Sequence, residues 1–291
     1  MEKEKLSNQR FAGERALFQR KNLFVEYSVF EDGESPVKEC NDITISNSQF
    51  KWKYPIWYSD KIELNSCLMD KMCRAAIWYC KDIVIKDTII NAPKTIRRSN
   101  NLDFANVSFF EGPETLWFCE NVKLKDVFVK GDYFAMNSKN IEVDNLELVG
   151  QYSFDGVENV TIRNSCLKTK DAFWNSKNVT VYDSFIGGEY LGWNAENLTL
   201  INCRIESLQG LCYVKNLVMK NCKLTNTTLA FEYSELDAEI CGRVDSIINP
   251  KSGVIKADSI GDLIIESDKI NPDDTKIICP SIDRHLDKPE Y

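Results

Sequence analysis

The side chains best suited to acid–base chemistry are carboxylates, because the 291-residue sequence has a single histidine, His285. One histidine argues against Ser–His and Cys–His nucleophile pairs and against histidine-rich metal sites. Asp155 in "YSFDGV" and Asp171 in "DAFWNS" are the candidate catalytic pair. Glycoside hydrolysis uses two carboxyl groups about 5 to 9.5 Å apart, and strand spacing puts these two roughly 11 Å apart. Solvated surface charges are the alternative for both, and we expect neither a metal nor a cofactor.

Tryptophan recurs in short segments of the same type, and aromatic side chains commonly mark binding surfaces. Arg97, the third candidate catalytic residue, takes the tryptophan position in "KTIRRS". We expect it to lie in a cation–π sandwich between Trp78 and Trp117, with Arg98 beside it, either as a clamp for a ligand or as a structural lock. The candidate sugar-stacking residues are Trp57, Trp78, Trp117, Trp174 and Trp193. The same segments add Tyr133, Tyr152, Tyr190, Lys170 and Glu189 as candidate substrate-binding residues.

A repeat of 19 to 21 residues sets the spacing of these side chains. Each copy starts with a polar residue followed by apolar-x-apolar, as in Asn178-Val-Thr-Val181 and Asn197-Leu-Thr-Leu200. This pattern indicates two short strands per copy, and the tryptophan-bearing segment predicts a third. Asn or Asp recurs at the corner between the first two strands, where it tolerates left-handed backbone and can form a ladder of side-chain hydrogen bonds. Three strands per copy predict one turn of a parallel β-helix.

The repeat predicts an all-β chain of about 12 coils. We expect a single domain over residues 1–291, with an N-terminal cap at 1–21, regular coils at 22–240, C-terminal coils or a cap at 241–279, and a tail at 280–291. Strand alternation sends one side-chain column inward and the next outward. The aliphatic residue before each tryptophan fits the interior, so the tryptophans are predicted to face out. The reverse orientation stays open, as does a purely structural aromatic stack.

The composition limits the classes of binding partner and the cellular compartment that we expect. A net charge of -8 argues against nucleic acid and anionic membranes as partners. The first residues, "MEKEKLSNQRFAGERALF", contain no continuous apolar core, so we expect neither a secretory signal nor a membrane anchor and predict a cytoplasmic protein. Eleven cysteines without metal-type pairing are then expected to be reduced and mostly buried. The sequence does not define an oligomeric state.

The coil pattern and the asparagine ladder resemble the right-handed parallel β-helix of pectin-lyase-like proteins, which include polysaccharide lyases and glycoside hydrolases. The segments "FAGERALF", "FKWKYPIWYS", "GDYFAMNS", "DAFWNS" and "GEYLGWN" are similar to an uncharacterised bacterial family that carries only a domain-of-unknown-function label. The resemblance implies a carbohydrate-active protein that binds an oligosaccharide or glycoconjugate on its aromatic outer face, as a glycoside hydrolase or polysaccharide lyase. The alternative is a non-catalytic β-helix scaffold that binds a glycan or a protein.

Overall fold

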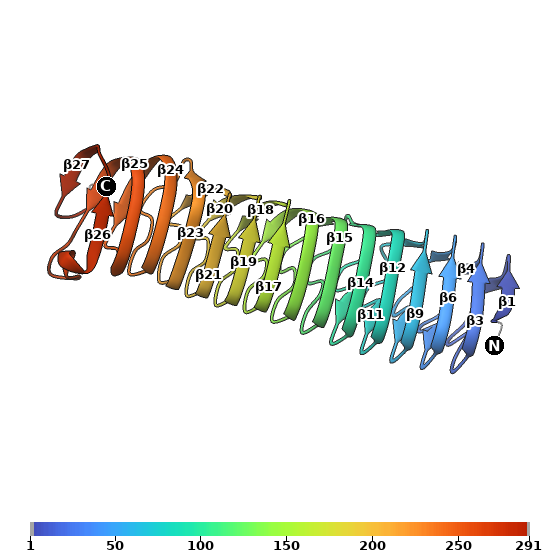
Figure 1. Ribbon diagram of the computed structural model, residues 1–291. Coiled ribbons are helices and arrows are strands. Elements are labelled where there is room, and N and C mark those ends of the chain that lie inside the picture. The colour runs from blue at the N-terminus through green and yellow to red at the C-terminus, as the bar shows by residue number, and fades with distance from the viewer. Residues whose placement is uncertain (1–2, 290–291) are drawn as a thin grey trace. The chain divides into compact units, whose positions relative to one another are not determined.

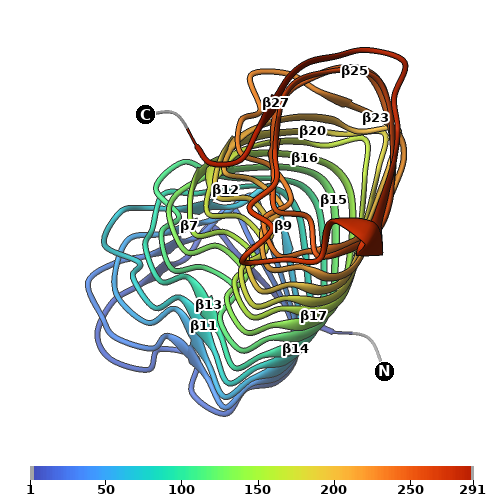
Figure 2. The same ribbon diagram turned by 90° about the vertical axis from the view of Figure 1, so that its left-hand side faces the viewer.

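The computed structural model describes residues 3–289 and is built almost entirely from parallel strands. The chain divides into two compact units, Met1–Gly150 and Gln151–Tyr291. In each unit every coil lies against the next in sequence order, as the colour gradient along the ribbon shows (Figure 1). Figure 2 turns the ribbon by 90°, so that the coils within a unit are seen one behind another. The predicted parallel β-solenoid is therefore confirmed, with about 15 turns where we expected about 12.

The first unit has one continuous line of parallel strands that carries the repeat. Its register matches the sequence repeat, since Ile83 pairs with Leu102 and Leu102 pairs with Val122. The line contains β1 (Glu4–Ser7), β3 (Lys21–Glu26), β6 (Asn41–Ser46), β9 (Asp60–Asn65), β12 (Lys81–Ile90), β14 (Asn100–Phe109), β15 (Glu120–Lys130) and β16 (Lys139–Gln151).

Two shorter lines complete the early coils of this unit. The line after the corner contains β2 (Arg10–Phe11), β4 (Val29–Phe30), β7 (Gln49–Phe50) and β10 (Leu68–Met69). In β12, β14, β15 and β16 the main strand itself runs through the corner, so no separate strand follows it in these coils. The tryptophan-bearing segments form a separate four-stranded sheet of β5 (Val37–Lys38), β8 (Ile56–Trp57), β11 (Ile77–Trp78) and β13 (Ile96–Arg97).

The second unit repeats the arrangement, with anchors again in register, as Val179 with Leu198 and Leu198 with Leu217. Its main line contains β17 (Glu158–Arg163), β19 (Lys177–Tyr182), β21 (Glu196–Ile201), β23 (Lys215–Leu224), β24 (Glu235–Ile248), β25 (Ser252–Ile264) and β26 (Thr275–Ile278). The remaining strands are β18 (Cys166–Lys170), β20 (Phe185–Glu189), β22 (Arg204–Leu208) and β27 (Ile282–Leu286), and β27 pairs with β25. Pro272–Asp274 form a short 3-10 turn.

The additional turns lie near the two ends of the sequence. β1 pairs with β3, placing Glu4 opposite Leu23, and β26 pairs with β25, placing Lys276 opposite Val254. In the last turns Leu236 pairs with Gly253 and Gly253 pairs with Thr275. Polar residues, Glu4 and Thr275, therefore stand where the repeat normally has its first apolar residue, so the sequence pattern did not reveal these turns. His285, which we placed in a tail, lies on β27 and is exposed.

The expected third strand is present only where the inward-facing residue is β-branched. Ile56, Ile77 and Ile96 are extended and lie in strands. In the coils from Leu116 to Leu211 the corresponding residues have left-handed backbone, for example Leu116 at φ 61° and Phe173 at φ 60°. A β-branched side chain strongly disfavours left-handed backbone, whereas leucine, alanine, phenylalanine and glycine tolerate it better. The prediction of a strand was therefore wrong for segments such as "DAFWNS", which form tight turns.

Corners and interior follow the predicted pattern. The amide of Asn106 donates to Asp87 at 2.7 Å and that of Asn221 donates to Asn202 at 2.8 Å, so the corner ladder is confirmed. A second ladder runs along the polar residue before each anchor, as from Asn197 to Asn178 at 2.8 Å. The interior is filled by stacked Ile, Val, Leu and Phe side chains.

The cysteines agree with the expectation of buried thiols. All eleven are free, and eight are buried. Burial raises the pKa of the Cys40 thiol to about 11 and that of the Cys73 thiol to about 12. These thiols are therefore protonated at neutral pH. Within residues 3–289, no helix has both the length and the apolar character needed to cross a membrane.

Candidate functional site

The tryptophan column faces outward and the preceding column faces the interior. Ile56, Ile77 and Phe173 are fully buried, whereas the five tryptophans are half-buried. Each indole N–H donates to a backbone carbonyl of the following coil. The five bonds run from Trp57 to Ala75 at 2.7 Å, Trp78 to Lys94 at 2.9 Å, Trp117 to Tyr133 at 2.6 Å, Trp174 to Tyr190 at 2.6 Å and Trp193 to Gln209 at 2.8 Å. These bonds fix the orientation of every ring in the column.

Stacking between neighbouring indoles covers the ring faces. Trp57 and Trp78 lie 5.4 Å apart between centroids with an interplanar angle of 4°, and Trp174 and Trp193 lie 5.7 Å apart at 13°. A sugar ring packs against the face of an aromatic ring, so these mutually stacked faces are already occupied.

Arg97 occupies the place that the sequence indicated. Its guanidinium lies 5.1 Å from the ring centroid of Trp78 and 4.1 Å from that of Trp117, which confirms the cation–π sandwich. One of its nitrogens also contacts the carboxylate of Glu114 at 2.5 Å. Because the positive charge is paired and both of its faces are covered, Arg97 stabilises the column and is poorly placed to clamp a ligand.

A more exposed surface of the first unit lies around the residues that follow Trp57, Trp78, Arg97 and Trp117, and it includes Lys38, which pairs with Trp57 in the column. Sequence reasoning singled out only Arg98 of this surface. We call Lys38, Tyr58, Tyr79, Arg98 and Phe118 the aromatic corner. The two tyrosines stack at 4.9 Å and 4°, Lys38 lies 5.8 Å from the ring of Tyr58, and Arg98 lies 5.1 Å from the ring of Phe118. Tyr58 is 49% exposed and Phe118 is 47% exposed. The available signal was the second aromatic in "IWY" and "LWF".

The polar candidates of the second unit form separate small groups. Asp155 accepts a hydrogen bond from the amide of Asn175 at 3.1 Å. Lys170 pairs with Glu189 at 2.8 Å, and this hydrogen bond raises the pKa of Lys170. The structure thus brings Lys170 and Glu189 together.

Asp171 is the buried acid of this region, with only 2% of its surface exposed. Burial raises the pKa of its carboxyl group, the nearby Lys170 lowers it, and Glu189 raises it again. A carboxyl group with a raised pKa has the character of a general acid. Its burial, however, keeps it away from a ligand on the surface.

The candidate tyrosines pack edge-on against the tryptophans. Tyr133 contacts Trp117, Tyr152 contacts Trp174, and Tyr190 contacts Trp193, with ring centroids 6.4, 6.2 and 5.3 Å apart. Across residues 3–289, no three His, Cys, Asp or Glu side chains are grouped closely enough to hold a metal ion.

Comparison with protein families gives a match over residues 4–278 to a model described as "Protein of unknown function (DUF3737)". The chain belongs to this family. No curated protein matches the sequence. Membership of the DUF3737 family agrees with the uncharacterised family expected from the sequence, and the family description assigns no activity.

Three solved structures resemble this DUF3737 chain at a distance. PfbA, a surface adhesin of Streptococcus pneumoniae, has 9% identity and a TM-score of 0.37, covering 92% of this chain and 80% of the adhesin chain. The A-module of the mannuronan C-5 epimerase AlgE4 of Azotobacter vinelandii has 8% identity and a TM-score of 0.26, covering 99% of this chain and 89% of the module.

Tailspike protein 3 of bacteriophage CBA120 has 10% identity and a TM-score of 0.28, and the match covers 100% of this chain and 55% of the tailspike chain. Of these three proteins, only the epimerase is named for a polysaccharide, mannuronan. Likenesses this distant do not indicate the activity of this chain.

Proposed function

We propose that the protein is a non-catalytic β-solenoid that binds an oligosaccharide or glycoconjugate at the aromatic corner. The observation that carries the proposal is the exposed pair of Tyr58 and Tyr79 beside the cations Lys38 and Arg98. The two rings cover one face of each other, as the indoles do, but the tyrosines are 49% and 40% exposed, whereas the tryptophans are half-buried. Tyrosine supplies both an apolar ring and a hydroxyl group, and a side chain with few rotatable bonds loses little entropy on binding. The backbone beneath the two tyrosines belongs to consecutive coils, so the surface is preformed.

The proposed role is binding because the candidate catalytic groups are engaged elsewhere. Arg97 is paired with Glu114 and stacked between two indoles. Asp171 is buried, and Asp155 is bonded to Asn175. A hydrolase or lyase needs at least one such group to reach the scissile bond. The glycosidase or lyase hypothesis is therefore the alternative. The cytoplasmic location and the exclusion of nucleic acid and membrane partners stay predictions.

A glycan array with matched variants tests the proposal. Tyr58→Asn/Tyr79→Asn removes both rings but keeps a residue suited to left-handed backbone, since φ is 52° and 59° at these positions. Tyr27→Asn is the control, because Tyr27 is an exposed tyrosine of the same unit, outside the corner, with φ 48°. We expect the double variant to lose about tenfold or more in affinity, and the control to match the wild type.

Three outcomes would contradict the proposal. Equal glycan binding by the double variant and the control would remove the corner from the binding surface. Release of reducing ends or of unsaturated product by the wild type, abolished by Asp155→Asn, would establish the enzyme hypothesis in its place. Binding of a protein with no glycan component at the aromatic corner would show that the partner is a protein and not a glycan.

A further inference from the structure

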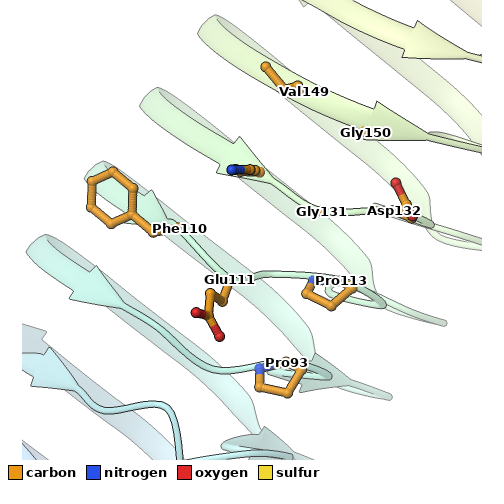
Figure 3. Close-up of a pocket in the computed structure, with 9 residues that line it drawn as sticks. Pro93, Phe110, Glu111, Pro113, Gly131, Asp132, Val149 and Gly150 are labelled. Carbon is orange, nitrogen blue, oxygen red and sulfur yellow. The ribbon is translucent and has the colours of Figure 1, made fainter.

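We infer that a groove on the first unit, between Phe110 and Pro113, is a subsite for a neutral sugar unit. This inference rests on the proposed carbohydrate class, but it places the ligand at a site separate from the aromatic corner. The groove has a volume of about 600 Å³, which lies within the range of about 300 to 1,000 Å³ typical of small-molecule sites. Figure 3 shows its lining side chains.

The floor of the groove is bare backbone, because glycine recurs there at intervals of nineteen residues. These glycines are Gly112, Gly131 and Gly150, and the last two line the groove. A Cβ atom on Gly131 would lie 2.5 Å from the carbonyl carbon of Gly112, and one on Gly150 would lie 2.1 Å from the carbonyl oxygen of Gly131. Any side chain would therefore collide with the neighbouring coil. The close stacking of coils thus leaves the floor without side chains (Figure 3).

The walls are apolar and include one well-exposed aromatic ring. Phe110 is 47% exposed, and its nearest aromatic neighbour, Phe128, is tilted by 45° at a centroid distance of 5.3 Å. This geometry differs from the parallel stacks of the tryptophan column, so no parallel ring covers Phe110. Val149 lies along the same side, and Pro93 and Pro113 form the opposite edge (Figure 3). The ring of Phe110 and the two prolines can contact the apolar face of a pyranose.

Charged groups of both signs lie around these apolar walls. Glu111, Lys130 and Asp132 line the groove, and Lys71 lies 3.0 Å from the carboxylate of Glu111. A purely apolar ligand would strip water from these groups without replacing its hydrogen bonds. A strongly charged ligand would meet opposite signs side by side. A neutral ligand with many hydroxyl groups satisfies both conditions, and this favours an uncharged sugar.

The groove borders the tryptophan column through consecutive residues. Pro113 precedes Glu114, which pairs with Arg97. Asp132 precedes Tyr133, whose carbonyl accepts the indole hydrogen bond of Trp117. The rigid column therefore holds the two turns that shape the groove, so the subsite is preformed rather than assembled by the ligand.

Isothermal titration of the full chain with cello-, malto-, manno- and xylotetraose, and with tetragalacturonate as the acidic probe, tests the inference. Phe110→Ala removes the ring and Val149→Trp fills the groove. Ile89→Ala is the control, since Ile89 is a similarly exposed aliphatic residue, 44% exposed, outside the groove. We expect a neutral tetrasaccharide to bind, both groove variants to weaken it about tenfold or more, and the control to leave it unchanged.

The corner variant Tyr58→Asn/Tyr79→Asn separates this inference from the proposed function. If only the groove variants lose binding, the groove is the sugar-binding site and the proposed site at the aromatic corner is wrong. If only the corner variant loses tetrasaccharide binding, the proposed function stands and the inference about the groove is wrong. Binding of tetragalacturonate in preference to every neutral probe would also overturn it, as would absence of binding by any tetrasaccharide. Circular dichroism spectra and melting temperatures show that each variant is folded.

Discussion

The guanidinium of Arg97 lies 4.1 Å from the ring centroid of Trp117, and its charge is paired with Glu114 at 2.5 Å. We expect Arg97→Gln to lower the free energy of unfolding by about 1 to 2 kcal/mol, because the cation–π contacts and the partly shielded ion pair are lost together. Arg98→Gln, at the exposed neighbouring position, should cost less than about 0.5 kcal/mol. Urea denaturation of both variants checks this, and equal costs would contradict a special role for Arg97.

Trp174 provides a test of whether the tryptophan column is structural. Trp174→Leu removes the stack with Trp193 and leaves the carbonyl of Tyr190 without its indole donor. We expect a loss of about 2 to 3 kcal/mol in unfolding free energy. Trp174→Phe keeps a ring but not the donor and should lose about 1 kcal/mol. If both variants unfold like the wild type and yet fail to bind glycans, the column is a binding platform after all.

Asp171 predicts a pH dependence of stability with a definite sign. Burial raises the pKa of this carboxyl group in the folded state, so the folded protein holds the proton at pH values where the unfolded chain has released it. The contribution of Asp171 to stability is therefore greatest in acid and falls as the pH rises through the folded-state pKa. Asp171→Asn should unfold at higher urea concentration than the wild type at pH 7.

The same variant should show a flatter dependence of stability on pH above the usual aspartate range. Asn is suited to the left-handed backbone at this position, where φ is 57°, so the substitution isolates the effect of charge. Denaturation midpoints measured from pH 4 to pH 8 for both proteins give the comparison. A variant less stable than the wild type at pH 7 would show that the Asp171 carboxylate has a favourable partner in the folded state.

Substitutions at Phe173 test why later coils lack the third strand. It is fully buried, and its φ is 60°. Phe173→Leu and Phe173→Ile remove nearly the same volume, so their cavity costs should be similar. The β-branched isoleucine should cost about 1 to 2 kcal/mol more, because it disfavours left-handed backbone. Equal melting temperatures for the two variants would exclude this explanation.

The periodicity of the sequence predicts the coil and its corners well, because both depend on local residue type. Asn178 and Asn197 recur at nineteen residues, and their side chains bond in the structure. The turns nearest the two ends of the sequence escaped detection because Glu4 and Thr275 replace the first apolar residue of the repeat. Strand pairing there depends on the neighbouring coil rather than on the local pattern.

The candidate site was harder to predict, because exposure depends on how rings pack across coils. The sequence places Trp57 and Trp78 on the outer face, but it does not say that their faces cover one another. The groove could have been found from the recurrence of Gly112, Gly131 and Gly150 at nineteen residues. That signal marks a close approach of backbones, while the exposure of Phe110 depends on the tilt of Phe128 and needed the structure.

The asparagine ladder has a consequence for how such a protein changes length in evolution. Asn178, Asn197 and Asn216 each bond only to the equivalent residue one coil away. Duplicating or deleting a complete nineteen-residue segment inside the regular coils restores every such bond, whereas inserting a few residues within a coil breaks several at once. Family members are therefore expected to differ in length by whole coils, and gene duplication of single coils is the route by which they lengthen.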